Sequence, residues 1–347
     1  MKYKLSDVVD RINGNVDRFT TSLEYYVGGE HFESNELEIT GCGLIKPNVN
    51  ILGFKFHFAF QPGDVLYMAR NPHLRKAGMV NFSGICSDAS YILRTKDSNV
   101  LCQEYLAVIM QSNHLWDYCE SHKVGSVNFA INWKTLANYE FDLPDINIQR
   151  SIANRIWAAY RVKQAYKKLI SATDEMVKSQ FIEWFGNAIQ SVPLEDVVEI
   201  LDNKRKPLND SQRSGMKSGQ LYPYYGATGV VDYVNAFLTD EDLICLAEDC
   251  GAYGPGEQSS YIIEGKAWVN NHAHVLRAKD NVILKYLQFF FTLTDLNEFI
   301  SGTTRKKLTQ SALKKIKVTL PDIELQELFV AIAEQADKSK YYEINET

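Results

Sequence analysis

Three cations stand in a row near the C-terminal end of the chain, directly after residues that bind phosphate well. The stretch Gly302-Thr303-Thr304 precedes Arg305-Lys306-Lys307. Hydroxyls and backbone amides bind phosphate oxygens, and an arginine can donate to both O6 and N7 of guanine in the major groove. The segment therefore predicts a contact with double-stranded DNA. The alternative is a solvated, lysine-rich surface.

The charge of the whole chain makes this segment stand out. There are 37 lysine and arginine residues against 43 aspartate and glutamate residues, which leaves a net charge of −6. Residues 301–321, in contrast, contain several cations and no acid. Positive charge concentrated on an acidic body is expected when one face meets phosphate and another does not.

Other loops carry residues of the same kinds. Arg70 and Asn71 follow a predicted strand and could read a base edge, and Arg75 and Lys76 could bind a phosphate. The basic cluster before Pro207 is expected to be an extended loop whose cations are free to reach phosphates, namely Lys204, Arg205 and Lys206.

The second half of the chain adds a polar loop residue and two acids. Thr228 follows a tyrosine-rich segment, 222–225, whose rings are expected to be mainly core. Glu248 and Asp249 could accept a hydrogen bond from cytosine N4, and a structural role for them is equally compatible with the sequence.

Catalytic and metal-binding patterns are weak. His272 and His274 lie near Cys245 and Cys250, but no second ligand pair has the spacing of a closed zinc site. A Walker A loop and a glycine-rich nucleotide-binding turn are absent from the sequence. A metal-dependent nuclease built on Asp249, Glu264 and Lys266 is the remaining enzymatic alternative.

An internal repeat organises these residues. Leu143-Pro144-Asp145-Ile146 returns as Leu320-Pro321-Asp322-Ile323, at an offset of 177, and the same offset aligns Gln149 with Gln326. Three further blocks recur in the same order: residues 5–10 at 194–199, residues 64–69 at 242–247, and residues 93–97 at 276–280. Ordered recurrence of this kind predicts a duplicated domain.

The repeat also identifies the first-copy counterparts of the basic segment. Gly125 aligns with Gly302, Ser126 with Thr303 and Asn128 with Arg305, so most of the charge is lost. A phosphate contact in the first copy is predicted for Ser126 and Lys134, and Asn128 is a further candidate for contact with DNA.

Each copy is predicted to begin with strands and end with a helix. Alternating phenylalanines over 54–60 and the apolar segments 64–69 and 242–247 indicate strands, and 100–120 and 282–300 indicate short helices. Residues 147–185 contain no glycine or proline, which predicts one helix roughly 58 Å long. Apolar residues at 3–4 spacing predict a coiled-coil seam that pairs this helix antiparallel with a shorter C-terminal one: Ala159, Val162, Tyr166, Leu169, Thr173 and Met176, with Leu325, Leu328 and Ile332.

Composition narrows the class of protein. With 45% hydrophobic and 23% charged residues, the chain is typical of soluble globular proteins. No apolar run is long enough to span a bilayer, and the first residues lack the apolar core of a signal peptide. Six scattered cysteines without a Cys-x-x-Cys pair indicate reduced thiols and a cytoplasmic location.

Two related domains held apart by rigid helices suggest a protein that reads two places on one long ligand. This organisation is similar to that of a known family. The chain resembles the specificity subunits of type I restriction–modification systems over essentially its whole length. The residues that carry the resemblance are 222–229, the stretch from Gly302 through Arg305 and Leu308 to Leu313, and Leu320-Pro321 leading to Gln326.

The resemblance implies a fold and a domain plan. The fold is α+β, with two β-rich target-recognition domains separated by long helices in an antiparallel coiled coil. We expect the first recognition domain at 1–145, the first spacer helix at 146–186, the second recognition domain at 187–321 and a short second helix at 322–347.

The resemblance also implies a role and partners. The chain is expected to be a non-catalytic subunit in host defence that reads a bipartite DNA target, without membrane contact. It would dock methyltransferase subunits, expected to be two, and a restriction subunit; S-adenosylmethionine, ATP and magnesium are expected on those partners. The rival from another class is a two-headed protein–protein adaptor.

Overall fold

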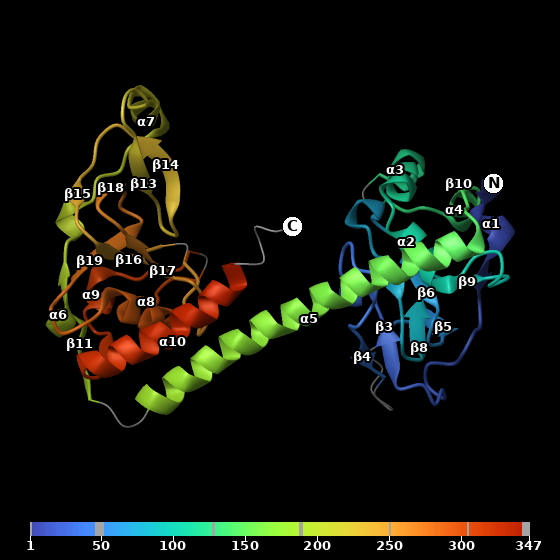
Figure 1. Ribbon diagram of the computed structural model, residues 1–347, viewed down its shortest axis with the longest axis horizontal. Helices are drawn as coiled ribbons and strands as arrows, with labels where there is room; N and C mark the ends of the chain where they lie inside the picture. The colour runs from blue at the N-terminus through green and yellow to red at the C-terminus, as the bar shows by residue number, and fades with distance from the viewer. Residues whose placement is uncertain are drawn as a thin grey trace. The chain divides into compact units, whose positions relative to one another are not determined.

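The computed structural model describes residues 2–45, 52–126, 129–186, 190–249, 251–303 and 305–341. It divides into two compact units, residues 1–166 and 167–347, and the division falls within the long helix α5 (Ile146–Phe185). Each unit combines sheets with helices (Figure 1). Among the described helices, none is both long and apolar enough to cross a membrane.

Two four-stranded sheets and a two-stranded ribbon make up the β-structure of the first unit. One sheet has the order β2-β9-β6-β7 and is antiparallel throughout: Val9–Ile12, Ser90–Thr95, Val65–Met68 and Ala77–Met79. The other has the order β4-β3-β8-β5, with β3 and β8 parallel: Gly43–Leu44, Tyr25–Val27, Gly84–Ser87 and Phe56–Phe60. The ribbon pairs β1 (Lys2–Lys4) with β10 (Glu140–Asp142).

The second unit repeats this topology strand for strand. Its antiparallel sheet is β12-β19-β16-β17: Val198–Ile200, Ala273–Ala278, Leu243–Ala247 and Ser260–Ile263. Its mixed sheet is β14-β13-β18-β15, with β13 and β18 parallel: Val230–Val234, Tyr222–Tyr225, Lys266–Val269 and Thr239–Asp240. A ribbon again pairs β11 (Ser191–Pro193) with β20 (Lys317–Thr319). The predicted duplication and mixed α+β class are confirmed.

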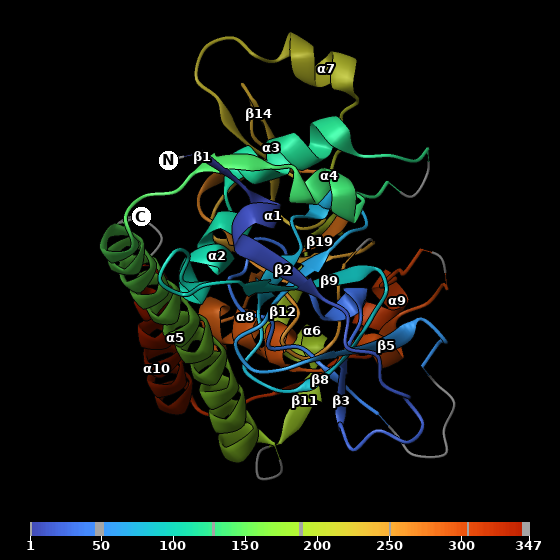
Figure 2. The same ribbon diagram turned by 90° about the vertical axis from the view of Figure 1, so that its right-hand side faces the viewer.

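Short helices connect these strands, and in each unit one of them packs against the antiparallel sheet. In the first unit they are α1 (Leu5–Val8), α2 (Gln103–Met110), α3 (Asn113–His122) and α4 (Trp133–Ala137), with 3-10 turns η1 (Gly29–His31) and η2 (Pro72–Leu74). In the second they are α6 (Leu194–Val197), α7 (Asp210–Gly215), α8 (Leu284–Leu293) and α9 (Gln310–Leu313), with η3 (Asp202–Lys204) and η4 (Asn297–Phe299). Figure 2 shows the helices from a second side.

In each unit one core, rich in aromatic residues, lies between the antiparallel sheet and the helices, and another lies between the two sheets. In the first unit, Tyr67 of β6 stacks on Trp116 of α3 with ring centroids 5.3 Å apart, and Trp157 of α5 is buried in the same cluster. In the second unit, Phe329 of α10 (Ile323–Tyr341) is fully buried and contacts the rings of Phe181 and Phe185 of α5. Within this unit α10 runs alongside the end of α5 in the opposite direction (Figure 1).

The repeated glutamines anchor the starts of the two helices that end each copy. Gln149 accepts from the Cys102 N–H and donates to the carbonyls of Val100 and Pro144, at 3.2, 2.8 and 2.9 Å. Gln326 accepts from the Ile283 N–H and donates to the carbonyls of Asn281 and Pro321, at 2.8, 3.1 and 2.9 Å. Both side chains are completely buried. The recurrence of glutamine at an offset of 177 thus reflects one structural role used twice.

An ion-pair cluster at the edge of the second antiparallel sheet makes stability depend on pH. Arg277 of β19 donates to both carboxylate oxygens of Glu241, at 2.6 and 2.8 Å, and Lys204 lies 3.2 Å away. The bond to Arg277, aided by Lys204, lowers the pKa of Glu241 from 4.5 to about 2. A carboxylate with a lowered pKa stabilises the fold above its unfolded pKa, and this stability is lost as the pH falls towards the folded pKa.

We therefore expect Glu241→Gln to lower the free energy of unfolding at pH 7, and this difference to shrink as the pH falls and to be small at pH 2. Denaturant unfolding of the full chain at a series of pH values, followed by intrinsic fluorescence, measures this difference. Glu298→Gln, at an exposed position, is the control and should leave the pH profile unchanged. Equal destabilisation by Glu241→Gln at pH 7 and pH 2 would contradict the assignment.

Candidate nucleic-acid interface

In the first unit the backbone brings together two loops that the sequence predicted separately. Arg70, directly after β6 and Ala69, forms an isolated β-bridge with Ala130, and Ala130 forms a second bridge with Val124. The Ile131 N–H donates to the Ala69 carbonyl at 2.9 Å. We call this arrangement of residues 69–71 against 124–131 the first two-loop bridge.

The second unit contains the same arrangement at the repeated positions. Asp249 bridges to Lys307, Lys307 bridges to Ser301, and the Leu308 N–H donates to the Glu248 carbonyl at 2.7 Å. Residues 248–249 against 301–308 form the second two-loop bridge. The equivalence makes Arg70 the counterpart of Asp249 and Ala130 the counterpart of Lys307.

In each unit a side chain of the adjacent central strand forms a hydrogen bond to a backbone carbonyl of the bridge. The Tyr91 hydroxyl of β9 donates to the Ile131 carbonyl at 2.9 Å, and His274 Nε2 of β19 donates to the Leu308 carbonyl at 2.8 Å. His274 Nδ1 also lies 2.7 Å from a carboxylate oxygen of Asp202. Burial opposes ionisation of Asp202, but the hydrogen bond from His274 and the charge of Arg205 keep its pKa below the usual value. No pattern in the sequence indicated this role of His274.

Helix caps and glycines define the other ends of the loops. Asn132 caps α4 by accepting from the Thr135 N–H, and Thr309 caps α9 by accepting from the Ala312 N–H. Gly125 and Gly302 both have positive φ, 112° and 85°. A Cβ atom at Gly302 would lie 2.3 Å from the Arg305 carbonyl oxygen, so the turn requires glycine.

The second bridge carries a dense set of ion pairs. Arg305 Nη2 lies 2.8 Å from Asp249 Oδ2, and Lys307 Nζ lies 3.0 Å from Glu248 Oε1. Arg205 also donates to Glu248, at 2.5 Å. Burial would raise the pKa of Glu248, but Arg205 and Lys307 hold it below its usual value. The two acids therefore accept hydrogen bonds from the chain's own cations.

The predicted contact residues of the first unit differ in how exposed they are. Arg70 is exposed, as are Ser126 and Lys134, the latter on α4. Asn71 and Arg75 adopt left-handed backbone conformations around η2. Arg75 donates to Asn113 at 2.6 Å and Lys76 to the Gly29 carbonyl at 2.8 Å, so both cations also hold the loop. Asn128 lies outside the described residues.

The cluster before Pro207 is extended at Arg205, as expected, but Lys204 lies at the end of a 3-10 turn. Asp202–Lys204 forms the 3-10 turn η3, because the Lys204 and Arg205 N–H groups donate to Leu201 and Asp202. Lys204 and Arg205 pair with acids of their own unit, Glu241 for the first and Asp202 and Glu248 for the second. The expectation that Lys204 and Arg205 are free to reach phosphates is therefore wrong, because both form ion pairs within their own unit.

The remaining residues predicted in the second unit lie at the surface. Lys206, Thr228, Thr303 and Lys306 are exposed, and Arg305 keeps 64% of its side-chain surface exposed. Thr304 lies outside the described residues.

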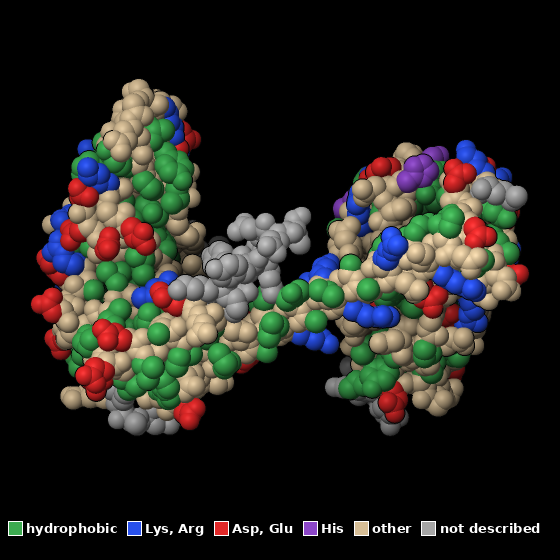
Figure 3. All heavy atoms as spheres, viewed as in Figure 1, with side chains coloured by type: hydrophobic (Ala, Val, Ile, Leu, Met, Phe, Trp, Pro, Cys, Tyr) green, Lys and Arg blue, Asp and Glu red, His purple; other side chains and the backbone are tan. Residues whose placement is uncertain are grey.

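The predicted seam of α5 is exposed, and the helix packs through other residues. Ala159, Val162, Tyr166, Leu169 and Met176 are exposed, and Figure 3 shows hydrophobic side chains on the exposed surface of this helix. The buried stripes are Ala153, Trp157 and Tyr160 in the first unit and Val177, Phe181 and Phe185 in the second. On α10, Leu328 is exposed and Leu325 and Ile332 are half-buried, whereas Phe329, Ala333 and Ala336 are buried. The prediction that α5 and α10 meet through the seam residues is wrong, because the two units bury a neighbouring stripe of α5 instead.

The side chains considered for metal binding have other partners. His272 Nδ1 lies 3.0 Å from Asp249, and His274 pairs with Asp202. Lys266 lies over the ring of Phe237, 4.9 Å from its centroid. Within the described ranges, no three His, Cys, Asp or Glu side chains come close enough together to hold a metal ion. Burial raises the pKa of the Cys86, Cys119 and Cys245 thiols to about 12, 11 and 12.

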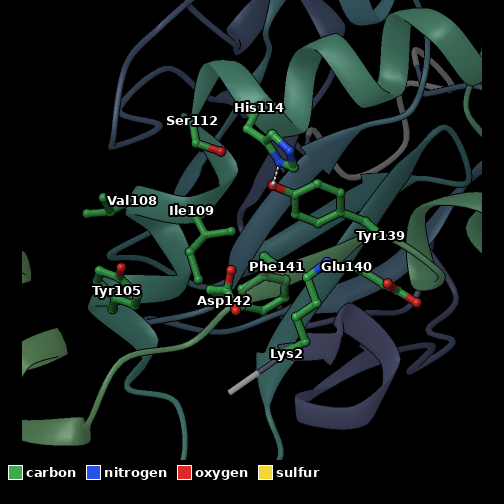
Figure 4. Close-up of a pocket in the computed structure, with 10 residues that line it drawn as sticks. All are labelled: Lys2, Tyr105, Val108, Ile109, Ser112, His114, Tyr139, Glu140, Phe141 and Asp142. Carbon is green, nitrogen blue, oxygen red and sulfur yellow. Dashed lines mark hydrogen bonds between the residues drawn. The ribbon is translucent and has the colours of Figure 1, made fainter.

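A cavity of about 460 Å³ in the first unit lies apart from the predicted contact residues. Its lining comes from β1, α2, α3 and β10 (Figure 4). His114 and the Tyr139 hydroxyl, 2.8 Å apart, are paired at its edge. Burial raises the pKa of Tyr139, so the hydroxyl stays protonated at neutral pH. None of the residues predicted to contact DNA lines this cavity.

Comparisons with known proteins give the family. The family model described as "Type I restriction modification DNA specificity domain" matches residues 1–171 and again residues 188–346. A putative type I restriction enzyme specificity subunit from Haemophilus influenzae, S.HindORF215P, is 33% identical over 150 residues, which is 42% of this chain and 37% of that protein. The match thus spans little more than a third of that relative's length.

Solved structures agree on the fold. The type I restriction–modification S subunit from M. genitalium has a TM-score of 0.62 at 13% identity, covering 98% of this chain and 89% of that one. A chain from a study of complex assembly and conformational transition of the type I R-M system has a TM-score of 0.54 at 16% identity, covering 98% and 90%. With two successive matches that cover nearly all of its residues, this chain belongs to the family of type I restriction–modification DNA specificity proteins.

Proposed function

We propose that the chain is a DNA-reading subunit that recognises a target in two parts, one with each unit. The observation that carries the proposal is the pair of two-loop bridges. Their backbones are equivalent, but they present different side chains, Arg70 in the first and Arg305 with Lys306 in the second. Two loops with the same backbone arrangement but different surface residues can recognise two half-sites of different sequence.

The proposal assigns the chemistry to other subunits. The described residues form no three-ligand metal cluster, and the acids of the second bridge are engaged by cations. The chain would act without a cofactor of its own, together with methyltransferase subunits that use S-adenosylmethionine and a restriction subunit that uses ATP and magnesium.

The exposed apolar residues of α5 support docking of such subunits. Val162, Leu169 and Met176 keep between 50% and 56% of their surface exposed, and together with Ala159 and Tyr166 they follow a 3–4 spacing. Apolar residues at this spacing favour packing against another helix. The stripe would be buried by a helix of a methyltransferase subunit, and Leu328 with Leu325 and Ile332 would extend the contact on α10.

Selection from a randomised duplex pool tests the proposal. The full chain, co-purified with a methyltransferase (modification) subunit, is used to enrich double-stranded DNA, and the bound fraction is sequenced. We expect a consensus in two parts separated by a spacer of constant length. Failure to enrich any sequence would refute the proposal, and a single continuous consensus would refute the assignment of one half-site to each unit.

Salt dependence tests the role of the lysines. Lys306 is exposed beside the second bridge, and we expect Lys306→Ala to reduce the slope of log K against log salt by about 0.9, the contribution of one phosphate contact. Fluorescence anisotropy of a selected duplex between 50 and 200 mM salt, roughly the range over which such contacts are lost, measures the slope. Lys285→Ala on α8 is the control, and an unchanged slope for Lys306→Ala would favour the solvated-surface alternative.

A further inference from the structure

The second two-loop bridge holds a buried carboxylate against an exposed arginine. The Asp249 side chain is only 11% exposed, whereas that of Arg305 is 64% exposed. Arg305 Nη2 donates to Asp249 Oδ2 at 2.8 Å, and His272 Nδ1 lies 3.0 and 3.1 Å from the two carboxylate oxygens. The acid is therefore fixed within the unit, and the guanidinium projects from it towards solvent.

This geometry leaves most of the guanidinium available for a ligand. Arginine has five N–H donors in a planar fork, and only Nη2 donates to Asp249. A side chain that is restrained before binding loses less conformational entropy when it forms a contact. The remaining donors can still meet the O6 and N7 acceptors of a guanine.

The first copy shows that the backbone bridge itself does not need an acid at this position. Arg70 is the counterpart of Asp249, and it forms the same bridge, to Ala130. The backbone bridge therefore does not depend on a carboxylate at this position. What the Asp249 carboxylate contributes is its contacts with the side chains of His272 and Arg305. Direct reading of cytosine by Asp249 is disfavoured, because its side chain is only 11% exposed and both oxygens already face His272 or Arg305.

We propose that Asp249 is a positioning residue for base recognition: it orients the Arg305 guanidinium so that this arginine reads one base of the second half-site. The proposal rests on the DNA-reading function proposed above. It deepens that function by naming the pair of side chains that sets specificity at one position.

The test measures base preference in the wild-type complex and in four variants. The full chain with its modification subunit is presented with the randomised duplex pool, and the preference at each position of the second half-site is then measured by competition. The variants are Asp249→Asn, Asp249→Glu, Arg305→Ala and the double variant Asp249→Asn with Arg305→Ala. Asp232→Asn is the matched control. Asp232 lies on β14 and is paired with Lys217 and Arg213, so this change neutralises another ion-paired acid of the same unit.

A bidentate contact to a base gives roughly 5- to 150-fold discrimination against the wrong base. We expect Asp249→Asn to reduce that preference at least about fivefold, at the same position as Arg305→Ala and with the first half-site unchanged. Asp249→Glu should restore part of the preference, because it returns the charge. In the Arg305→Ala background, Asp249→Asn should have no further effect on base preference.

Each contrary result has a distinct meaning. If the wild-type complex enriches no sequence, the DNA-reading function fails first, and the positioning role falls with it. If the wild type selects a bipartite target and Asp249→Asn keeps every base preference, only the positioning role is overturned. A change in preference caused by Asp249→Asn when Arg305 is already alanine would also overturn it, because Asp249 would then act independently. Thermal melting of every variant separates these results from a general loss of folding.

Discussion

Replacing Arg305 with alanine is expected to weaken binding of the selected duplex by about 1–3 kcal/mol, with the loss confined to the second half-site. The guanidinium is exposed, held by Asp249 at 2.8 Å, and carried on a turn that requires Gly302. A base contact contributes to affinity and to discrimination, whereas a phosphate contact contributes to affinity alone. Competition binding with duplexes substituted at each position of both half-sites distinguishes the two.

Arg70→Ala is the comparison in the first unit, because Arg70 is an exposed arginine of the first two-loop bridge. It should reduce affinity for the first half-site and leave the second unchanged. An effect of Arg305→Ala spread equally over both half-sites would argue against one recognition surface in each unit. Unchanged affinity and unchanged preference would remove Arg305 from the interface.

The second large effect is expected on stability. Gln149→Ala and Gln326→Ala should each lower the free energy of unfolding of their own unit by about 2–4 kcal/mol. Each change removes a completely buried amide and leaves one backbone N–H and two carbonyls without their partner. Denaturant unfolding measures the loss, and hydrogen exchange locates it.

The hydrogen-exchange readout should differ between the two variants. Gln149→Ala should expose the Cys102 amide at the start of α2, and Gln326→Ala the Ile283 amide before α8. Gln335→Ala, at an exposed position of α10, is the control and should change neither. Loss of protection in the wrong unit, or in both units from a single substitution, would contradict the assigned anchoring roles.

The order of the elements was predictable because the repeat is carried by local patterns. Strands β6 and β16 lie in the predicted segments, and the absence of glycine and proline over 147–185 predicted α5. One alignment was off by one residue. Val65 and Ile244 pair with Leu93 and Leu276, which the repeat equates, so the sheet aligns Val65 with Ile244 and not with Leu243. Sequence similarity at two apolar strands does not reveal such a slip, because neighbouring buried residues are all hydrophobic.

The helix surface shows a different limit. Apolar residues follow two neighbouring stripes along α5, and in both the spacings are of three or four residues, which fit a helix. Trp157 and Phe181 belong to the stripe that the domains bury, whereas Val162 and Leu169 belong to the one left exposed. The periodicity indicates that a helix face is apolar, but the packing of the surrounding strands and helices determines which apolar face is buried.

By itself, the amino-acid sequence determined that the chain is a duplicated α+β protein with a long helix between its copies, and that positive charge gathers at residues 305–307. Spacing and side-chain type contain that information, because turns, strands and helices depend on neighbours in the chain. The contacts of Asp249 with Arg305 and of His274 with the Leu308 carbonyl, and the ion pairs of Arg205 within its unit, are set by the folding of distant segments. These contacts join residues 34 or more positions apart, and their formation depends on the sheet that brings the two loops together.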